Sequence, residues 1–447
     1  MKIKIAGAGA GKTTKMAERI IDSYQKISDY QNIYCITFTN NAVDCIGTKL
    51  REHFGEIPQN IKLSTIHSFL NQEIIKPYYY ILFNKQFIKV SRINLSNVPA
   101  YRRSKISQLE KENILHVSVF SERAKWVISK KSSDNNKERK IRASILRNFK
   151  KYCGHIFIDE AQDIDKNMLE IIKTFNMVPI NIELIGDPKQ DLKGTNSLRL
   201  LIEEFTEDVE YIKECYRCPQ NHLDISNTLI PKSEWQYSEK SYGTISVIFQ
   251  SDIDLSTFFN SNSFDLKYIS EQNKEYSTKN DMNNLRFRTL FYEVTYMLNH
   301  SLKNKDELRI KQVAYYLTTK LISKFKETNN EKEAMKIISP YIKGDKQTYA
   351  KIISSLKIGY NEEETTKIFL SSIDSIKGQE GMNCLFVLTN DLAAYLFQEK
   401  KTSNKIKNRL YVALTRSLDK LSILISHEVE VKYGKDYIVD FFNMYTL

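Results

Sequence analysis

The sequence is poor in cysteine and proline and has no long apolar run, and each shortage excludes a class of protein. Six cysteines scattered over 447 residues are too few for the disulfide framework of a small secreted domain. Only eight prolines are present, with no proline-rich linker and no internal repeat. No apolar run approaches the roughly 20 residues of a membrane helix, and residues 1–14 lack the apolar stretch of a secretory signal. We therefore expect a cytoplasmic chain that does not enter a membrane.

The chain does have enough apolar material for several cores, and it carries an excess of positive charge. Apolar residues make up 41% of the sequence and charged residues 27%, which excludes a disordered protein, and the length predicts about three lobes. The net charge of +12 favours a polyanionic partner such as nucleic acid. Residues 123–151 hold 11 lysines and arginines against two acids, which predicts either a solvated helix pair or a nucleic-acid surface.

The first 27 residues carry the pattern of a phosphate-binding loop. An alternating strand at 2–5 runs into a glycine-rich segment, and a helical pattern follows. In such loops backbone N–H groups surround the phosphates, a lysine bridges the terminal phosphates, and a hydroxyl holds Mg²⁺. The pattern is AxxxxGKT, with alanine where glycine is usual. We predict that the nucleotide is bound by Ala6, Gly7, Ala8, Gly9, Ala10, Gly11, Lys12, Thr13 and Thr14, with Thr13 on Mg²⁺.

An acidic pair follows a second buried strand, as nucleotide hydrolysis requires. Apolar residues at 156–158 predict the strand, and Asp159 and Glu160 emerge at its C-terminal end, where ligands bind in open α/β sheets. One carboxylate is needed for the water shell of the metal and one to polarise the attacking water. We predict that Asp159 contributes to Mg²⁺ binding and that Glu160 is the general base. Surface charge on a loop is the alternative, and the upstream P-loop makes it the weaker one.

The alternation of strand and helix patterns predicts the fold class. Further strand patterns occur at 33–37, 155–158, 181–185, 245–249, 384–388 and 421–425. Helical stretches separate them, and βαβ units of this kind form parallel sheets in an α/β fold. Residues 73–152 and 261–364 interrupt the rhythm and predict two mostly helical insertions.

The chain has one CxxC pair, Cys215 and Cys218. The pair could be half of a zinc site or a redox pair. No second CxxC or CxxH is available to complete a tetrahedral site, so two buried structural thiols are the favoured interpretation.

Further blocks follow the P-loop in a definite order. They read TFTNNA at 37–42, STIHSF at 64–69, DEAQD at 159–163, GDPKQ at 186–190, ECYR at 214–217, DSIKGQE at 374–380 and YVALTR at 411–416. In sequence and order they are similar to the motifs of the UvrD/Rep-type superfamily 1 DNA helicases. The resemblance implies two RecA-like parallel-sheet core domains with helical insertions, and ATP with Mg²⁺ bound between the two cores.

The resemblance also implies a role for each block. Gln190 senses the terminal phosphate, Tyr216 stacks on the base of ATP, and Glu380 lies at the nucleotide. Arg217 and Arg416 reach the γ-phosphate from the second core, where guanidinium groups stabilise the charge of the transferring phosphoryl group. The residues expected to contact single-stranded DNA are Phe38, Thr39, Asn40, Thr65 and His67. Closing and opening of the cores then drives translocation, 3′ to 5′. The resemblance makes zinc at the CxxC pair still less expected.

Four features depart from the family pattern. The chain begins five residues before Ala6, without the adenine-reading block, so we expect relaxed base selectivity. Residues 191–197 lack the aromatic side chains that stack on DNA bases. Asp374 replaces a histidine beside the DNA backbone, so that contact is not expected. Both insertions are short and the chain ends 31 residues after Arg416, as in compact members such as the helicase-like subunit of the Gabija anti-phage defence system.

The expected domain organisation follows from the motifs and the interruptions. The first RecA-like core comprises 1–72 and 153–218, with a basic helical insertion at 73–152. The second core comprises 219–260 and 365–447, with a reduced helical insertion at 261–364.

The sequence thus predicts a DNA-stimulated ATPase that acts as a translocase or helicase on single-stranded DNA or a tailed duplex. The resemblance to the Gabija subunit implies an OLD-type nuclease as partner, and the chain contains no nuclease motif of its own. Two alternatives stay open, a nucleotide-sensing ATPase subunit without processive unwinding and a stand-alone repair helicase.

Overall fold

A computed structural model describes residues 1–96, 98–129, 133–240, 242–278, 281–301, 307–341, 346–357 and 368–445. Lys130 and Lys131 of the basic run and parts of the predicted second insertion lie outside the described residues. The chain divides into two compact units, one formed by Met1–Phe249 with Lys377–Leu447 and the other by Gln250–Ile376. No described helix is both long and apolar enough to cross a membrane.

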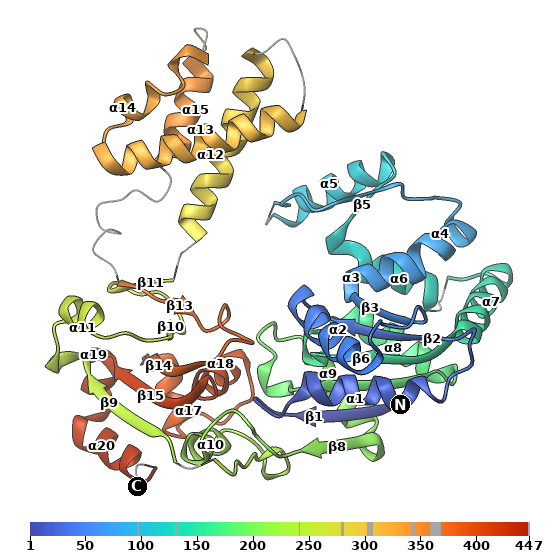
Figure 1. Ribbon diagram of the computed structural model, residues 1–447, viewed down its shortest axis with the longest axis horizontal. Helices are drawn as coiled ribbons and strands as arrows, with labels where there is room; N and C mark the ends of the chain where they lie inside the picture. Colours follow the sequence, from blue (N-terminus) through green and yellow to red (C-terminus); the bar gives the residue numbers. More distant parts are fainter. Residues whose placement is uncertain are drawn as a thin grey trace. The chain divides into compact units, whose positions relative to one another are not determined.

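A six-stranded parallel sheet forms the centre of the first core (Figure 1). Its strands, in spatial order, are β3 (Ile61–Thr65), β2 (Asn32–Thr37), β6 (Cys153–Ile158), β7 (Asn181–Gly186), β1 (Lys2–Ala6) and β8 (Val209–Ile212). The predicted strands at 2–5, 33–37, 155–158 and 181–185 are confirmed, whereas β3 and β8 were not predicted. Since all six strands are parallel, their carboxyl ends lie along one edge, where the P-loop and the acidic pair follow β1 and β6.

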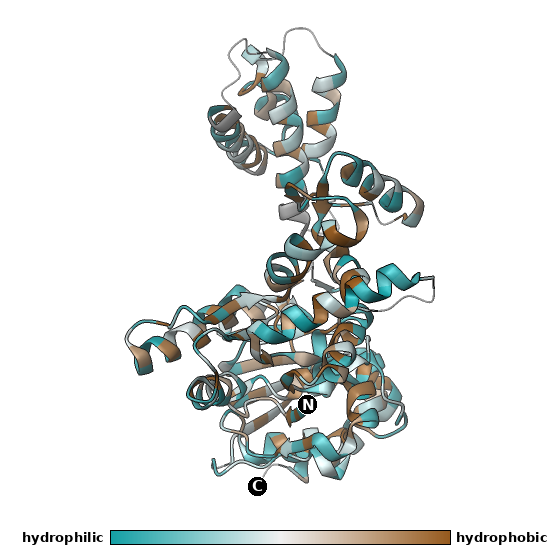
Figure 2. Ribbon diagram, turned by 90° about the vertical axis from the view of Figure 1, so that its right-hand side faces the viewer, coloured by the Kyte–Doolittle hydropathy of each residue, from teal (hydrophilic) through white to brown (hydrophobic). Residues whose placement is uncertain are grey.

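Helices cover both faces of this sheet, because alternate side chains of each strand point to opposite sides. On one face α1 (Lys12–Tyr24) and α2 (Asn40–Phe54) pack on Ile33 and Cys35. On the other, α8 (Lys166–Met177) and α9 (Ser197–Glu204) pack on side chains that include Tyr34 and Ile36. Figure 2 shows that many surface helices carry both hydrophobic and hydrophilic residues, as expected of helices that pack on a sheet with one side and face solvent with the other.

The segment predicted as the first insertion is largely helical and includes one short ladder. After β3 come α3 (Ile66–Phe69), a π-helical turn (Leu70–Ile75), α4 (Lys76–Phe83), α5 (Pro99–Lys111), α6 (Phe120–Ile128) and α7 (Asn136–Tyr152). Strands β4 (Lys89–Ser91) and β5 (Ile114–His116) pair in parallel. Helix α7 starts with a capping box between Asn135 and Glu138. The domain limits 1–72, 73–152 and 153–218 stay predictions.

The same unit holds three parallel strands of the second core. They lie in the order β14 (Gly381–Leu388), β15 (Ser417–Ile425) and β9 (Thr244–Phe249), which confirms the strands predicted at 245–249, 384–388 and 421–425. The helices of this part are α10 (Gln220–Asn227), α17 (Asn390–Leu396), α18 (Lys405–Leu414), α19 (His427–Tyr433) and α20 (Lys435–Asn443). Two parallel sheets with helices between the strands confirm the predicted α/β class.

The second compact unit is built mainly of helices. Helices α12 (Asp281–Ser301), α13 (Glu307–Thr328), α14 (Glu331–Met335) and α15 (Lys346–Leu356) share one apolar core. Smaller elements of this unit are α11 (Leu255–Ser261), β10 (Leu266–Ile269), β11 (Tyr276–Ser277), β12 (Ile368–Phe369) and β13 (Ser371–Ser372). The limits 261–364 of the reduced insertion stay a prediction.

Candidate nucleotide-binding and catalytic site

The predicted P-loop joins β1 to α1 in a conformation that depends on glycine. Gly9 and Gly11 have φ angles of 70° and 69°, in the left-handed region that side chains with a Cβ disfavour. The loop leads directly into the N-terminus of α1, whose first N–H groups lack intrahelical partners. The Nζ of Lys12 lies 3.4 Å from the carbonyl oxygen of Ala6 and 3.2 Å from that of Gly7. This arrangement places a cation and helix N–H groups together, as a phosphate site needs.

The acidic pair stands at the carboxyl end of β6. Asp159 is 1% exposed, and its Oδ1 accepts a hydrogen bond from the backbone N–H of Glu160 at 2.9 Å. Burial and the neighbouring Glu160 raise the pKa of Asp159, although Lys12 opposes the shift. Burial would also raise the pKa of Glu160, but Lys12, Lys377 and a hydrogen bond from Gln162 outweigh it and lower the pKa. One carboxylate of the pair is therefore favoured as an anion and the other is held partly protonated.

This environment fits a divalent cation. A buried carboxylate with a raised pKa, next to a second carboxylate, gains most from a positive charge placed beside it. Thr13, at the start of α1, and Asp159 are the residues that would hold Mg²⁺. Bound there, the ion would neutralise phosphate charge and orient the terminal phosphate.

A chain of hydrogen bonds links Glu160 to the predicted phosphate sensor. Gln162 donates to the Glu160 carboxylate, and its Oε1 accepts from the backbone N–H of Asp187 at 2.9 Å. Gln190 donates to Asp187 Oδ2 at 2.8 Å. Asp187 also forms an ion pair of 2.9 Å with Lys189. Glu160 and Gln190, the predicted general base and phosphate sensor, are thus connected through buried hydrogen-bonded groups.

The ECYR segment, residues 214–217, lies against the P-loop. The backbone N–H of Tyr216 donates to the carbonyl oxygen of Gly9 at 2.9 Å, and the Tyr216 ring is 62% exposed. Arg217 Nε donates to Glu380 Oε2 at 2.6 Å. Lys15 Nζ lies 5.8 Å from the centre of the Tyr216 ring. The structure therefore brings together the predicted residues Tyr216, Arg217 and Glu380 beside the phosphate loop, with an exposed ring available for stacking.

Two residues at the loop were not predicted as site residues, although one lies within a motif. The hydroxyl of Tyr411 accepts from the backbone N–H of Ala8 at 3.2 Å and donates to Gln236 Oε1 at 2.7 Å. Gln236 Nε2 donates to the Ala8 carbonyl oxygen at 3.1 Å, and a Cβ added to Gly7 would collide with this side chain. Tyr411 is part of the YVALTR block, but the sequence carried no signal for Gln236.

Comparisons with known proteins agree with this geometry. Residues 1–195 match the family model described as an AAA domain. The chain is 24% identical to the Gabija protein GajB of Bacillus cereus (strain VD045), over 97% of the chain and 94% of that protein. It is 25% identical to the ATP-dependent DNA helicase Rep of Buchnera aphidicola subsp. Schizaphis graminum, over 54% of the chain and 44% of Rep. It is 24% identical to the ATP-dependent DNA helicase PcrA of Staphylococcus epidermidis, over 52% of the chain and 39% of PcrA.

The chain is thus similar to GajB and, over about half its length, to DNA helicases of the UvrD/Rep type. It spans nearly the whole of GajB but less than half the length of Rep and PcrA.

The predicted arginine finger is buried. Arg416 is 0% exposed and donates to the carbonyl oxygens of Val412 at 3.0 Å and Gln379 at 3.2 Å. Its guanidinium therefore connects the end of α18 to the residues just before β14. The contact of Arg416 with γ-phosphate stays a prediction.

The predicted DNA contacts lie at the carboxyl ends of β2 and β3. Thr39 and Thr65 cap α2 and α3, so their hydroxyl oxygens accept hydrogen bonds from backbone N–H groups. Asn40 is the first residue of α2 and is exposed. Lys193 Nζ lies 5.2 Å from the centre of the Phe38 ring. Partial burial, and secondarily the charge of Lys193, lower the pKa of His67, which favours the neutral imidazole.

The segment that lacks aromatic residues forms a compact turn. The carboxylate of Asp191 accepts hydrogen bonds from the backbone N–H groups of Lys193 at 3.0 Å, Gly194 at 2.8 Å and Asn196 at 2.8 Å. This turn brings Lys193 close to the Phe38 ring.

Cys215 and Cys218 are buried beneath the P-loop. They are 3% and 0% exposed, and Cys215 Sγ donates to the Ala8 carbonyl oxygen at 3.2 Å. A hydrogen bond from Cys218 lowers the pKa of the Cys215 thiol to about 6. Among the described residues there is no group of three or more histidine, cysteine or acidic side chains that could hold a metal ion.

Proposed function

We propose that the chain is an ATP-dependent translocase or helicase that moves 3′ to 5′ along single-stranded DNA, hydrolysing ATP between its two cores. The observation that carries the proposal is the convergence on one loop of residues from both cores. Lys12 and Asp159 belong to the first core, and Tyr411 and Gln236 of the second core form hydrogen bonds with Ala8 of the loop. Such a two-sided site allows nucleotide to draw the cores together.

The chemistry assigned to each side chain follows from its surroundings. Lys12 and the N–H groups of the loop bind the β- and γ-phosphates. Glu160, whose pKa is lowered, is ionised near pH 7 and accepts the proton of the attacking water. Gln190 orients that water through the hydrogen-bond chain of Asp187 and Gln162. Arg217, held by Glu380 before nucleotide binds, exchanges this carboxylate for the γ-phosphate.

A role beside an OLD-type nuclease in phage defence is the finer part of the proposal. It is supported by the similarity to GajB, which extends over 97% of the chain. Co-expression with such a nuclease and size-exclusion chromatography tests it. Co-elution of the two proteins in a fixed ratio is expected, and separate elution at micromolar concentration would contradict the partnership.

Direction and unwinding are tested on duplexes with a single-stranded tail. The purified chain is expected to open a duplex that carries a 3′ tail and to leave a duplex with a 5′ tail closed, provided that ATP is present. The Lys12→Ala variant is the matched control and should open neither. Opening of the 5′-tailed duplex alone would refute the assigned direction.

A nucleotide-sensing ATPase without processive movement is the second candidate. It is favoured by the turn at residues 191–197, in which Asp191 holds the backbone and no aromatic side chain is present for stacking. DNA-stimulated ATP turnover without opening of either tailed duplex, alone or with the nuclease, would support this candidate over the motor.

A further inference from the structure

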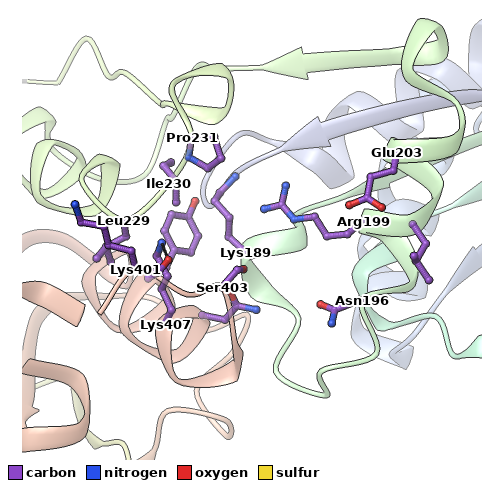
Figure 3. A pocket seen from close by; sticks show the side chains of 13 residues that line it. Lys189, Asn196, Arg199, Glu203, Leu229, Ile230, Pro231, Lys401, Ser403 and Lys407 are labelled. Atoms are coloured by element: carbon purple, nitrogen blue, oxygen red, sulfur yellow. Dashed lines mark hydrogen bonds between the residues drawn. The ribbon is translucent and has the colours of Figure 1, made fainter. Parts of the chain in front are cut away.

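A pocket that is lined in part by Tyr411 lies within the first compact unit. Its volume is about 570 Å³, which is within the range of small-molecule sites. Figure 3 shows Asn196, Arg199 and Glu203 of the α9 segment on one side and Leu229, Ile230, Pro231 and Lys401 on the other, with Lys189 between them. The pocket is therefore built by both cores.

One part of the pocket wall is cationic. It contains Lys189, Arg199, Lys401 and Lys407. The first two are paired, since Lys189 Nζ lies 2.9 Å from Asp187 and 3.2 Å from Glu234, and Arg199 also pairs with Glu234. Lys407 Nζ donates to the carbonyl oxygen of Lys401 at 3.2 Å, and neither of these lysines forms an ion pair with a carboxylate in the described part of the chain. The lining also contains one carboxylate, Glu203, so basic side chains outnumber acidic ones in the pocket.

The surroundings of Lys407 lower its pKa, as a site that accepts an anion does. Burial, and secondarily the charge of Arg199, lower the pKa of Lys407, although Tyr395 opposes the shift. A cation that is partly desolvated next to a second cation is destabilised, and an anion bound beside Lys407 would offset this effect.

The rest of the wall is apolar. Leu200 comes from α9, and the segment 229–231, with the sequence Leu-Ile-Pro, follows α10. Leu200 is 43% exposed, whereas Leu229 is 3% exposed. A pocket with a cationic part and an apolar part fits a ligand that has both a phosphate and a flat, poorly solvated group.

We propose that this pocket binds a second nucleotide, distinct from the one at the P-loop. Lys401 and Lys407 hold its phosphate groups, and the segment 229–231 packs against its base. Because Tyr411 lines the pocket and accepts a hydrogen bond from Ala8, the occupant lies one side chain away from the phosphate loop. The proposal goes beyond the motor function and does not require it.

The test uses the full chain with Lys12→Ala, which weakens the P-loop site and leaves the pocket intact. ADP is titrated by calorimetry into this variant and into the same variant with Lys401→Gln and Lys407→Gln. The first is expected to bind ADP at one saturable site, and the second to bind it at least about tenfold more weakly, because two charge-assisted contacts are lost. Lys400→Gln is the matched control, since Lys400 is an exposed neighbour outside the pocket lining.

Two further probes identify the ligand. Inorganic pyrophosphate is expected to bind more weakly than ADP, and oligothymidine is expected not to compete with ADP. If pyrophosphate bound as tightly as ADP, the apolar wall would contribute nothing to binding, which would contradict the nucleotide assignment. Competition by oligothymidine would make the pocket part of the DNA track and would also contradict it.

Two results on the variants themselves would overturn the proposal. One is the absence of any ADP binding to Lys12→Ala, and the other is unchanged ADP binding after the lysine replacements. Thermal unfolding of each variant shows that the chain remains folded. ATP turnover of the unmodified chain is measured separately, because its loss concerns the P-loop and not the pocket.

Discussion

Replacing Gly9 with alanine tests whether the segment of Cys215 and Arg217 packs on the P-loop in the nucleotide-free chain. Gly9 has a φ angle of 70°, and an added Cβ would collide with Arg217 Cβ and lie 3.0 Å from Cys215 Sγ. Gly194 has the same φ angle of 70°, but nothing lies within 4 Å of its added Cβ. The two substitutions therefore share the backbone strain and differ only in the collision.

The expected losses of stability follow from the backbone strain and the collision. Left-handed backbone costs a residue with a Cβ about 1–2 kcal/mol, which is the whole expected effect of Gly194→Ala. The collision adds about 1–3 kcal/mol for Gly9→Ala, as overpacking does in protein cores. In domains of 150–250 residues each kcal/mol lowers the melting temperature by roughly 2–4 °C.

Scanning calorimetry of both variants without nucleotide gives the comparison. Gly9→Ala is expected to melt several degrees below Gly194→Ala, and the unmodified chain should melt above both. Equal melting temperatures for the two variants would mean that the Tyr216–Arg217 segment does not lie against Gly9 in solution.

Three more predictions concern catalysis, stability and pH. Glu160→Gln should bind ATP as the unmodified chain does but turn it over about 100-fold more slowly or worse, because the general base is lost, as single-turnover kinetics would show. Arg142→Met should lower the unfolding free energy by about 3–5 kcal/mol in urea titrations, because Arg142 forms a 2.8 Å ion pair with Asp134 and both are almost fully buried. Burial lowers the pKa of His155 and of His222 from 6.5 to about 4, so the unfolded chain binds more protons and stability falls as the pH drops from 6.5 to 4. Replacing both histidines with glutamine should flatten that slope, and an unchanged slope would exclude them as its cause.

The elements that sequence patterns predicted best are those whose strands are buried on both faces. The runs at 155–158 and 421–425 each contain one polar residue, His155 or Ser422, among apolar ones, and both lie inside the observed strands. Strand β3 has polar residues at three of its five positions and β8 has two exposed residues of its four, so neither carried a continuous apolar signal. Edge strands of a parallel sheet are therefore the ones that the sequence patterns missed.

The candidate site divides in a similar way. The P-loop and the acidic pair each follow one strand, so local sequence determines their geometry. Gln236 and Tyr411 form hydrogen bonds with Ala8, although they lie 228 and 403 positions away in the sequence. The packing of the two cores brings them together. A glutamine outside every motif gives no sign of such a contact, and the pairing of Arg217 with Glu380 depends on the same packing.

The most direct test of the central claim is steady-state ATP hydrolysis by the purified chain, with and without single-stranded DNA, in parallel with Lys12→Ala. The proposed motor predicts turnover that single-stranded DNA stimulates strongly and that Lys12→Ala abolishes. Turnover that is indifferent to DNA, or that persists in Lys12→Ala, would contradict a DNA-coupled motor built on this P-loop.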